Sequence, residues 1–199
     1  VFAALADSSG RLSAEYTNDG LHLTGAGYMK WSAVIADEMY DYPALIPKPA
    51  TMQWQHETAE LSLFKTIQVT HPVLRKEAVL IQQLLSGINI PIRITNQPAS
   101  KGNTIRLQLS QEITGEEGYR LTVTPGAIVL TARNATGIFY AIQTVRQLIR
   151  GKHIQCAEII DAPAFPYRGF MVDVGRNYQS IRQLKEQIDV MAAYKLNIF

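Results

Sequence analysis

Apolar positions recur along this chain at two spacings, and each spacing predicts a different kind of element. Apolar side chains three or four residues apart predict helices over residues 24–40, 72–87, 134–151 and 180–195. Alternating or continuous apolar positions in shorter runs predict strands over residues 63–70, 90–95, 104–110, 119–125, 127–133 and 167–174. The pattern therefore predicts a fold that combines helices and strands.

The helix expected over residues 72–87 has a clear apolar face. Leu74, Ala78, Ile81 and Leu85 lie on one side of such a helix, which predicts that this side packs on a sheet. Gly87 follows where a left-handed residue commonly ends a helix, so the spacing predicts a glycine C-cap.

Two other expected helices have equally clear apolar faces. The helix over 134–151 ends at Gly151, and its apolar residues are Ile138, Ala141, Ile142, Val145, Leu148 and Ile149. The helix over 180–195 begins at Ser180, a residue type that favours the N-cap. Its predicted buried stripe is Ile181, Leu184, Ile188 and Met191.

The N-terminal part has one predicted helix and then a change in composition. Over residues 24–40 the apolar groups that share a helical face are Tyr28, Trp31, Ile35 and Met39. The stretch that follows contains Pro43, Pro47 and Pro49, a composition typical of linkers. We therefore expect a domain boundary at residues 43–50.

The order of the central elements indicates the fold class. A short turn, "TPGA", separates the runs 119–125 and 127–133, which predicts an antiparallel hairpin. Helices and strands do not alternate regularly across residues 51–160. This order predicts an α+β domain, a mixed or antiparallel sheet with two helices packed on it, rather than a doubly wound sheet.

Residues 161–199 have a different order. A strand over 167–174, a helix over 180–195 and a second apolar run at 196–199 make one βα unit and the start of another. One such unit cannot bury both faces of its strands. We expect it either to dock on residues 50–158 or to belong with further chain.

Composition and charge narrow the function classes. The 199 residues are 47% hydrophobic and 18% charged, as in ordinary globular proteins. The net charge is +2 and the basic residues are not clustered, so no nucleic-acid partner is expected. No apolar run approaches the roughly 18 residues of a membrane span. Cys156 is the single cysteine and is expected to be a small buried hydrophobe.

The two ends of the sequence suggest a chain taken from a longer one. The first residues, "VFAALADSSG", lack both an initial Met and the basic region of a signal peptide. The last residues, "YKLNIF", stop within an apolar run. His56, His71 and His153 are scattered without metal-ligand spacing, and no metal or organic cofactor is expected.

Polar residues at the ends of the expected strand 167–174 are candidates for function. Asp173 and Arg176 lie at its exit end, where barrel enzymes place working residues, and Arg168 lies near its entry. Position alone makes Arg176 the better ligand candidate and Arg168 the better candidate for a structural ion pair. The alternatives for Arg176 are a structural salt bridge to Asp173 or a contact at the rim of the barrel.

Several motifs of residues 47–199 resemble glycoside hydrolase family 20, the β-N-acetylhexosaminidases. "DAPAFPYRGFMVDVGRNY" and the later "YKLN" resemble the opening of the family's catalytic (β/α)8 barrel. "EEGYRLTVTPGAIVLTARNATGIFYAIQTVRQLI" resembles the α+β domain that precedes this barrel. The resemblance implies hydrolysis of terminal β-linked N-acetylhexosamine, with the substrate's own acetamido oxygen as nucleophile.

The resemblance also has consequences for individual residues. Arg176 matches the arginine that binds hydroxyls of the terminal sugar. The family usually has a His after this arginine, whereas this chain has Asn177. The catalytic Asp–Glu pair belongs to a later barrel strand that this sequence does not contain, so the 199 residues alone are expected to be inactive.

A second candidate site lies near the N-terminus. Asp19 and His22 are three residues apart on a loop that leads into a helix, which can place both side chains on one side of a turn. An Asp that orients a His is two thirds of a hydrolytic triad. The alternative within this chain is an N-capping Asp and a surface His.

The stretch around this pair, "DGLHLTGAGYMKW", resembles the last sequence block of SGNH (GDSL-type) hydrolases. That resemblance covers about 30 residues and implies that Asp19 and His22 are the Asp and His of an esterase triad. The family's nucleophilic Ser would lie before Val1.

The sequence thus predicts four parts. Residues 1–42 are the tail of an SGNH-type esterase domain, 43–50 a linker, 51–160 a non-catalytic α+β domain, and 161–199 the start of a truncated (β/α)8 barrel. The alternatives are a non-enzymatic carbohydrate-binding or scaffold module, or part of a carbohydrate esterase. The expected partner is a glycan with terminal N-acetylhexosamine, which places the protein in the periplasm or outside the cell; the oligomeric state stays open.

Overall fold

The computed structural model describes residues 5–19, 22–38, 42–97 and 102–199. The chain divides into two compact units, Val1–Tyr42 and Pro43–Phe199.

The first unit contains helix α2 (Gly25–Glu38), within the range that the apolar spacing predicted. The Thr24 hydroxyl accepts a hydrogen bond from the Gly27 N–H and so satisfies one of the free donors at the helix start. Tyr28 and Trp31 form an edge-to-face ring pair but are 55% and 39% exposed. The two rings therefore share a helical face, as their spacing predicted, and that face is exposed at both positions. Met39 and the side chain of Ile35 lie outside the described residues.

The second unit is built on one mixed sheet of eight strands among the described residues, in the order β1-β8-β5-β6-β4-β2-β3, with β7 beside β8. The strands are β1 (Thr51–Glu60), β2 (Phe64–Val69), β3 (Arg93–Thr95), β4 (Asn103–Leu109), β5 (Tyr119–Val123), β6 (Ala127–Ala132), β7 (Ile149–Arg150) and β8 (His153–Asp161). The helices of this unit are α3 (Arg75–Ser86), α4 (Ala135–Leu148) and α5 (Ile181–Ala193), with 3-10 turns at Leu61–Leu63 and Pro72–Leu74.

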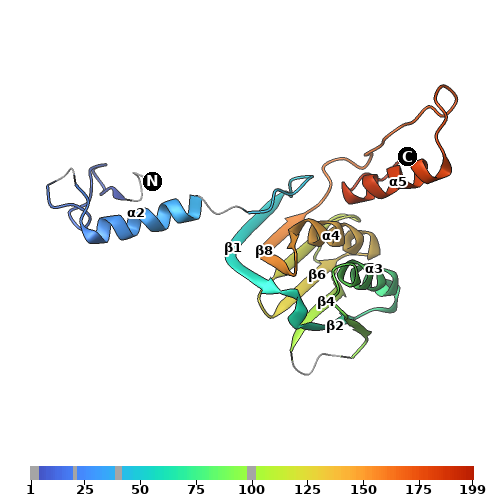
Figure 1. The fold of residues 1–199 in the computed structure, drawn as a ribbon, viewed down its shortest axis with the longest axis horizontal. Helices are drawn as coiled ribbons and strands as arrows, with labels where there is room; N and C mark the ends of the chain where they lie inside the picture. Colours follow the sequence, from blue (N-terminus) through green and yellow to red (C-terminus); the bar gives the residue numbers. More distant parts are fainter. Residues whose placement is uncertain (1–4, 20–21, 39–41, 98–101) are drawn as a thin grey trace. The chain divides into compact units, whose positions relative to one another are not determined.

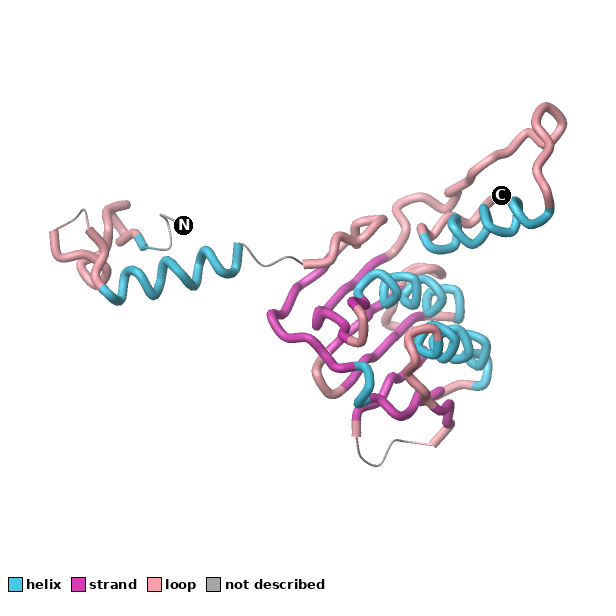
Figure 2. The backbone as a smooth tube through the Cα atoms, viewed as in Figure 1, coloured by secondary structure: helices cyan, strands magenta, loops and turns pink. Residues whose placement is uncertain are grey.

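Strand directions confirm the mixed α+β sheet. The pairs β2–β3, β2–β4 and β4–β6 are parallel, whereas β5 pairs antiparallel with β6 and β8, and β1 with β8. The hairpin predicted around "TPGA" is present as β5–β6, closed by Thr124 and Ala127. Helices α3 and α4 lie side by side over one face of the sheet (Figures 1 and 2).

The core lies between that face and the two helices. The face predicted for α3 is confirmed, since Leu74, Ala78, Ile81 and Leu85 are each at most 1% exposed. Helix α4 begins at Asn134, whose side chain accepts a hydrogen bond from the Gly137 N–H. The apolar side predicted for this helix is buried as well, apart from the partly buried Ile149.

Two glycines do not have the role that the sequence suggested. Gly87 has ordinary helical dihedral angles, and the left-handed residue in this turn is Asn89, with φ 61°. The chain passes Gly87 in a further helical turn before it reverses, so a left-handed residue is needed only two positions later. Gly151 is left-handed, but it turns the chain between β7 and β8, because α4 ends earlier at Leu148.

Strands β1 and β8 were not predicted from the sequence. Strand β1 is an edge strand with polar residues in most positions, and its pairing with β8 is interrupted by an irregularity between Trp54 and Thr58. Strand β8 carries polar and apolar residues together and lies between β1 and β5. The polar residues in both strands weaken the alternation by which a half-buried strand is recognised in a sequence.

The C-terminal segment differs most from expectation. Ser180 and Gln183 form a full capping box, which confirms Ser180 as the N-cap of α5. Of the stripe predicted to be buried, however, only Met191 is buried, whereas Ile181 is 72% and Ile188 48% exposed. The predicted strand 167–174 is reduced to one parallel bridge, Gly169 to Ile198. A strand needs neighbours to form ladders, and the described chain supplies a single partner at this place.

Candidate functional site

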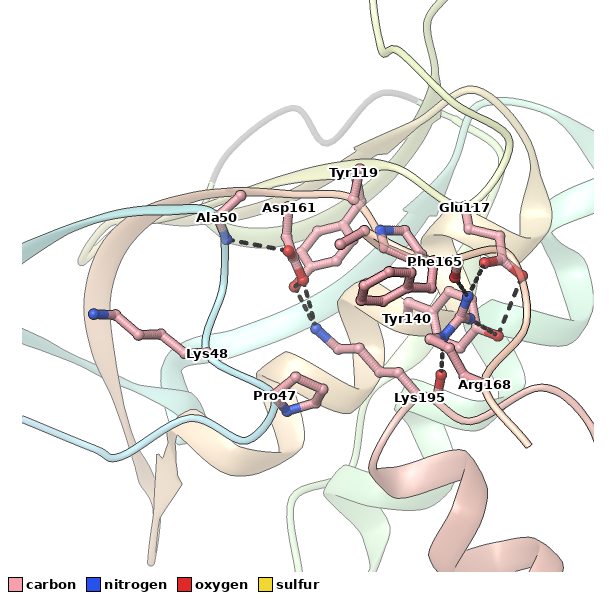
Figure 3. Close-up of a pocket in the computed structure, with 13 residues that line it drawn as sticks. Pro47, Lys48, Ala50, Glu117, Tyr119, Tyr140, Asp161, Phe165, Arg168 and Lys195 are labelled. Atoms are coloured by element: carbon pink, nitrogen blue, oxygen red, sulfur yellow. Dashed lines mark hydrogen bonds and ion pairs between the residues drawn. The ribbon is translucent and has the colours of Figure 1, made fainter. Parts of the chain in front are cut away.

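A cavity of about 310 Å³ lies where the C-terminal segment meets the sheet (Figure 3). Its walls come from the segment before β1, the ends of β5 and β8, helix α4 and residues 162–168. Residues that define it are Pro47, Tyr119, Asp161, Phe165, Arg168 and Lys195. The walls are largely apolar and two cations are paired with two carboxylates along them.

Lys195 occupies the most buried of the charged positions in this cavity. Its Nζ donates to the Asp161 carboxylate at 2.9 Å and to the Tyr119 hydroxyl at 2.7 Å, and the whole residue is 6% exposed. Burial lowers the pKa of the Lys195 ammonium, although the Asp161 charge opposes this shift. Burial and the same Asp161 charge raise the pKa of Tyr119 well above its usual range.

Arg168 makes a second, parallel set of contacts. Its Nη1 lies 2.8 Å from a Glu117 carboxylate oxygen, and its Nη2 donates to the Tyr140 hydroxyl at 3.1 Å. Its Nε donates to the backbone carbonyl of Lys195 at 2.7 Å. The structural ion pair expected for Arg168 is therefore present, with Glu117 as the partner. Burial and the Glu117 charge raise the pKa of Tyr140.

The segment 43–50, predicted to be a linker, has no helix or strand but is held on the domain. Ile46 exchanges two hydrogen bonds with the side-chain amide of Gln147, one through its N–H and one through its carbonyl, both at 2.9 Å. The Ala50 N–H donates to the free oxygen of Asp161 at 3.2 Å, and Leu45 is buried in the core. This segment therefore behaves as a strap of the α+β domain.

Arg168 and Lys195 thus each have a carboxylate partner within hydrogen-bond distance, and both carboxylates are shared with neighbouring donors. Groups that are so fully engaged hold segments together rather than react with a substrate. The charged groups of this cavity therefore hold the C-terminal segment on the α+β domain.

Arg176 is placed apart from this cavity by the turn at Asp173. One oxygen of Asp173 accepts hydrogen bonds from the N–H groups of Gly175 and Arg176, which shapes the turn. The other oxygen lies 3.4 Å from Arg176 Nε, so the alternative ion pair weighed for this arginine is present. The Arg176 side chain is 90% exposed, so this ion pair is open to solvent.

Asp19 and His22 are brought together as their spacing suggested. Asp19 Oδ2 lies 2.7 Å from His22 Nδ1, and Oδ1 accepts a hydrogen bond from the His22 N–H, also at 2.7 Å. The imidazole side chain is 77% exposed. A carboxylate on Nδ1 leaves Nε2 as the nitrogen that faces away from the pair, which is the arrangement of a triad His.

The other residues that the sequence singled out have structural surroundings. His153 lies 3.2 Å from Glu60, and His71 accepts a hydrogen bond from the Val73 N–H. Cys156 is buried, and burial raises the pKa of its thiol. Within the described ranges no group of His, Cys, Asp and Glu could hold a metal ion, and no helix there is long and apolar enough to cross a membrane.

Comparison with known families places both parts of the second unit. The family described as glycosyl hydrolase family 20, domain 2 matches residues 42–162, more than half of the chain. The chain belongs to glycosyl hydrolase family 20. A second match, described as the family 20 catalytic domain, covers residues 165–199. The two matches meet at residues 162–165, which border the cavity, so the cavity of this family 20 chain lies at a domain junction.

Curated relatives support this assignment. A β-hexosaminidase of Porphyromonas gingivalis is 31% identical over 170 residues, which are 78% of this family 20 chain and 22% of the relative. A β-N-acetylhexosaminidase of Cellulomonas fimi is also 31% identical, over 78% of this chain and 33% of the relative. The chain therefore spans between a fifth and a third of the length of these relatives.

Solved structures agree in fold. An exo-β-N-acetylglucosaminidase of Vibrio harveyi superposes with a TM-score of 0.67 at 26% identity, over 79% of this chain and 26% of that one. A β-hexosaminidase of Streptomyces plicatus superposes with a TM-score of 0.66 at 27% identity, over 80% of this chain and 35% of that one.

Several residues of the cavity were not singled out from the sequence, among them Glu117, Tyr119, Tyr140, Asp161 and Lys195. One signal for Lys195 was available, because a charged residue there separates a helix from the apolar run that follows. Nothing in the sequence indicated that Asp161 and Tyr119 would meet it, since these residues come from strands far apart along the chain.

Proposed function

We propose that this chain is part of a β-N-acetylhexosaminidase that removes terminal β-linked N-acetylhexosamine from glycans. Membership of family 20 is the observation that carries the proposal, together with relatives that are named for this activity. The exposed position of Arg176, just after the predicted strand 167–174, supports its role as a sugar ligand.

In this proposal Arg176 donates hydrogen bonds to hydroxyls of the terminal sugar. A guanidinium suits that task because it has five N–H donors in a fixed plane. Its exchange of Asp173 for sugar hydroxyls costs little, because an exposed ion pair contributes weakly to stability. Retaining catalysis by the substrate's acetamido group requires an Asp–Glu pair from a later part of the barrel. The 199 residues by themselves are accordingly proposed to be inactive.

Substitution of Arg176 in an enzyme that carries the complete barrel tests the proposal. Arg176→Ala should lower kcat/KM for a chromogenic β-N-acetylglucosaminide by roughly 10- to 1,000-fold, because bonds to the sugar are lost in the transition state. Arg182→Ala is the matched control, since Arg182 is an equally exposed arginine paired with Glu186 on the same segment. Equal kinetics for the two folded variants would contradict a ligand role for Arg176.

We also propose that residues 1–42 are the tail of an SGNH-type esterase domain. The hydrogen bond between Asp19 and His22 supports this, because it orients the imidazole as a triad requires. In a protein that includes the preceding chain, Asp19→Asn and His22→Ala should each abolish hydrolysis of an acetyl ester and leave hexosaminidase activity unchanged. Esterase activity that survives both changes would remove the pair from catalysis.

A rival to the enzyme proposal is a non-catalytic module that binds carbohydrate. The α+β domain would then retain glycans on an array with the 199-residue chain, and Arg176→Ala would not change the binding pattern. The enzyme proposal expects weak binding that depends on Arg176.

A further inference from the structure

We propose that Arg168 and Lys195 are positioning residues. Each binds to a site on the α+β domain that consists of one carboxylate and one tyrosine, called a socket from here on. The two contacts together fix residues 165–198, including the run that leads to Arg176. The docking does not depend on the proposed function, whereas its effect on Arg176 rests on it. Figure 3 shows the two cations side by side with their partners.

The two sockets repeat the same set of groups. Each consists of one carboxylate and one tyrosine from the α+β domain. Glu117 and Tyr140 receive Arg168, with the guanidinium carbon 5.4 Å from the ring centroid. Asp161 and Tyr119 receive Lys195, with Nζ 4.8 Å from the ring centroid. A carboxylate supplies charge and a tyrosine ring supplies a negative face, so both sockets are selective for a cation.

The α+β domain and the C-terminal segment carry opposite charges at this contact. Both acidic groups belong to the α+β domain and both basic groups belong to the C-terminal segment. The four side chains of the ion pairs are at most 23% exposed. Coulombic attraction at such sites is much less screened by solvent than at an open surface. The contact is therefore directional, and loss of one charge leaves its partner buried and unpaired.

The two cations are also tied to each other through the backbone. Arg168 Nε donates to the Lys195 carbonyl, and the Arg168 N–H donates to the Asn197 side chain at 3.0 Å. The Asn197 N–H in turn donates to the Arg168 carbonyl at 2.9 Å. The two stretches around Arg168 and Lys195 therefore dock as one body, and the bridge from Gly169 to Ile198 extends the same contact.

Backbone conformation at Lys195 gives an independent indication. This residue ends α5 with φ 60°, in the left-handed region where glycine is preferred and a lysine is strained. A strained conformation persists where the surroundings impose it. Here the ammonium is anchored by Asp161 and Tyr119, which explains why a lysine occupies a position suited to glycine.

Asp161 extends the junction to the strap. One of its oxygens binds Lys195 and Tyr119, and the other accepts the Ala50 N–H. The Tyr119 hydroxyl also bonds to Thr144 of α4 at 2.7 Å. The strap, the sheet, helix α4 and the C-terminal segment thus meet at one carboxylate, and the segment that leads to Arg176 starts from this point.

Hydrogen exchange on the 199-residue chain tests the docking. Lys195→Gly is the informative variant, because it relieves the left-handed backbone while it removes the whole side chain with its ammonium. If the proposal holds, the amide hydrogens of peptides covering 165–170 and 194–199 exchange at least about tenfold faster in this variant than in the wild-type chain. The exchange of peptides from β4 and β6 stays unchanged. If Lys195 merely caps α5, glycine would leave exchange unchanged or slow it, and that result would overturn the proposal.

Two further variants keep this test decisive. Glu117→Gln empties the other socket of its charge and should loosen the same two peptides, whereas Arg182→Ala, which removes an exposed cation of the same segment, should not. Faster exchange spread evenly over the whole sheet in both socket variants would also overturn the proposal, because the pairs would then stabilise the domain rather than the docking.

Kinetics in the full enzyme separate the docking from its effect on the sugar ligand. Glu117→Gln should lower kcat/KM in the presence of Arg176 and have a several-fold smaller effect in the Arg176→Ala background, because the two changes act on one contact. Additive effects, together with faster exchange, would retain the docking and refute the positioning of Arg176. Unaltered exchange would refute the sockets, whatever the activity of the enzyme.

Discussion

At the scale of single residues, the buried pair of Lys195 and Asp161 is the most consequential feature of this chain. An ammonium that is almost wholly buried is unfavourable unless hydrogen bonds and an opposite charge compensate for the lost water. Asp161 and Tyr119 provide both. Because this compensation depends on the charges of a few groups, the free energy of unfolding should change with the protonation of Lys195, Asp161 and Tyr119.

Tyr119 makes this response testable through pH. Its pKa is raised in the folded chain above the unfolded value of about 10, so the folded state holds the phenolic proton more tightly. The stability that this provides is complete below about pH 10 and is lost as the pH rises further. The pKa of Lys195 is lowered in the folded chain, so its contribution to stability increases as the pH rises toward its unfolded pKa, which is opposite to the effect of Tyr119.

We therefore expect the advantage of the wild-type chain over Tyr119→Phe, measured by urea unfolding, to be smaller at pH 10.5 than at pH 8. Tyr167→Phe is the control, since Tyr167 is 71% exposed and should show no such change. An advantage that grows with pH would contradict the assignment of the Tyr119 proton.

At the scale of elements, helix α4 depends on one close approach. A methyl group at Gly137 would overlap the carbonyl oxygen of Gly118 and the Cβ of Ala132, so the first turn of the helix lies directly on the sheet. The same turn is capped by Asn134, which also donates to Glu116. Only glycine permits the helix to start this near to β5 and β6.

Gly137→Ala should consequently destabilise the domain by about 1–3 kcal/mol, although alanine has the higher helix propensity. Thr136→Ala, one position earlier on the exposed side of the helix, should change the free energy of unfolding little. The two variants are compared by urea unfolding followed by circular dichroism. A stabilised Gly137→Ala chain would show that the turn can move away from the sheet without cost.

At the scale of the whole molecule, the main core belongs to the second unit alone. All residues of this core lie from Leu45 to Ile159, and most come from the strap, the sheet and helices α3 and α4, with others from the 3-10 turns and the loop before β3. The strap has an apolar anchor at Leu45 and polar anchors at Ile46 and Ala50. Residues 43–50 therefore belong physically with the domain that follows them.

Removal of residues 1–42 should leave the thermal unfolding midpoint of the remaining chain unchanged, whereas removal of residues 1–50 should lower it. The first cut leaves the strap in place, and the second removes Leu45 from the core and the Ile46 hydrogen bonds from Gln147. Calorimetry on the two truncated chains measures the difference. Equal midpoints would show that the strap contributes nothing to stability.

The features of the fold that could be predicted from the sequence are those that depend on local patterns of residues. Helices α3 and α4 and the β5–β6 hairpin were predicted because their faces, caps and turns are local patterns. The exposed stripe of α5 was misjudged, because an apolar face predicts burial without saying which element covers it. Asp19, His22 and Arg176 were found by spacing and position, and their catalytic or ligand roles stay predictions.

The sequence by itself determined the periodic elements, the α+β class and the family resemblance, since each depends on residues near one another along the chain. Only the tertiary structure decided that 43–50 is a docked strap and that Lys195 and Arg168 enter paired sockets. Those contacts join residues separated by dozens of positions, such as Tyr119 and Lys195. Hydrogen bonds and ion pairs act over a few ångströms in space, and a linear pattern does not record which distant groups the fold will bring that close.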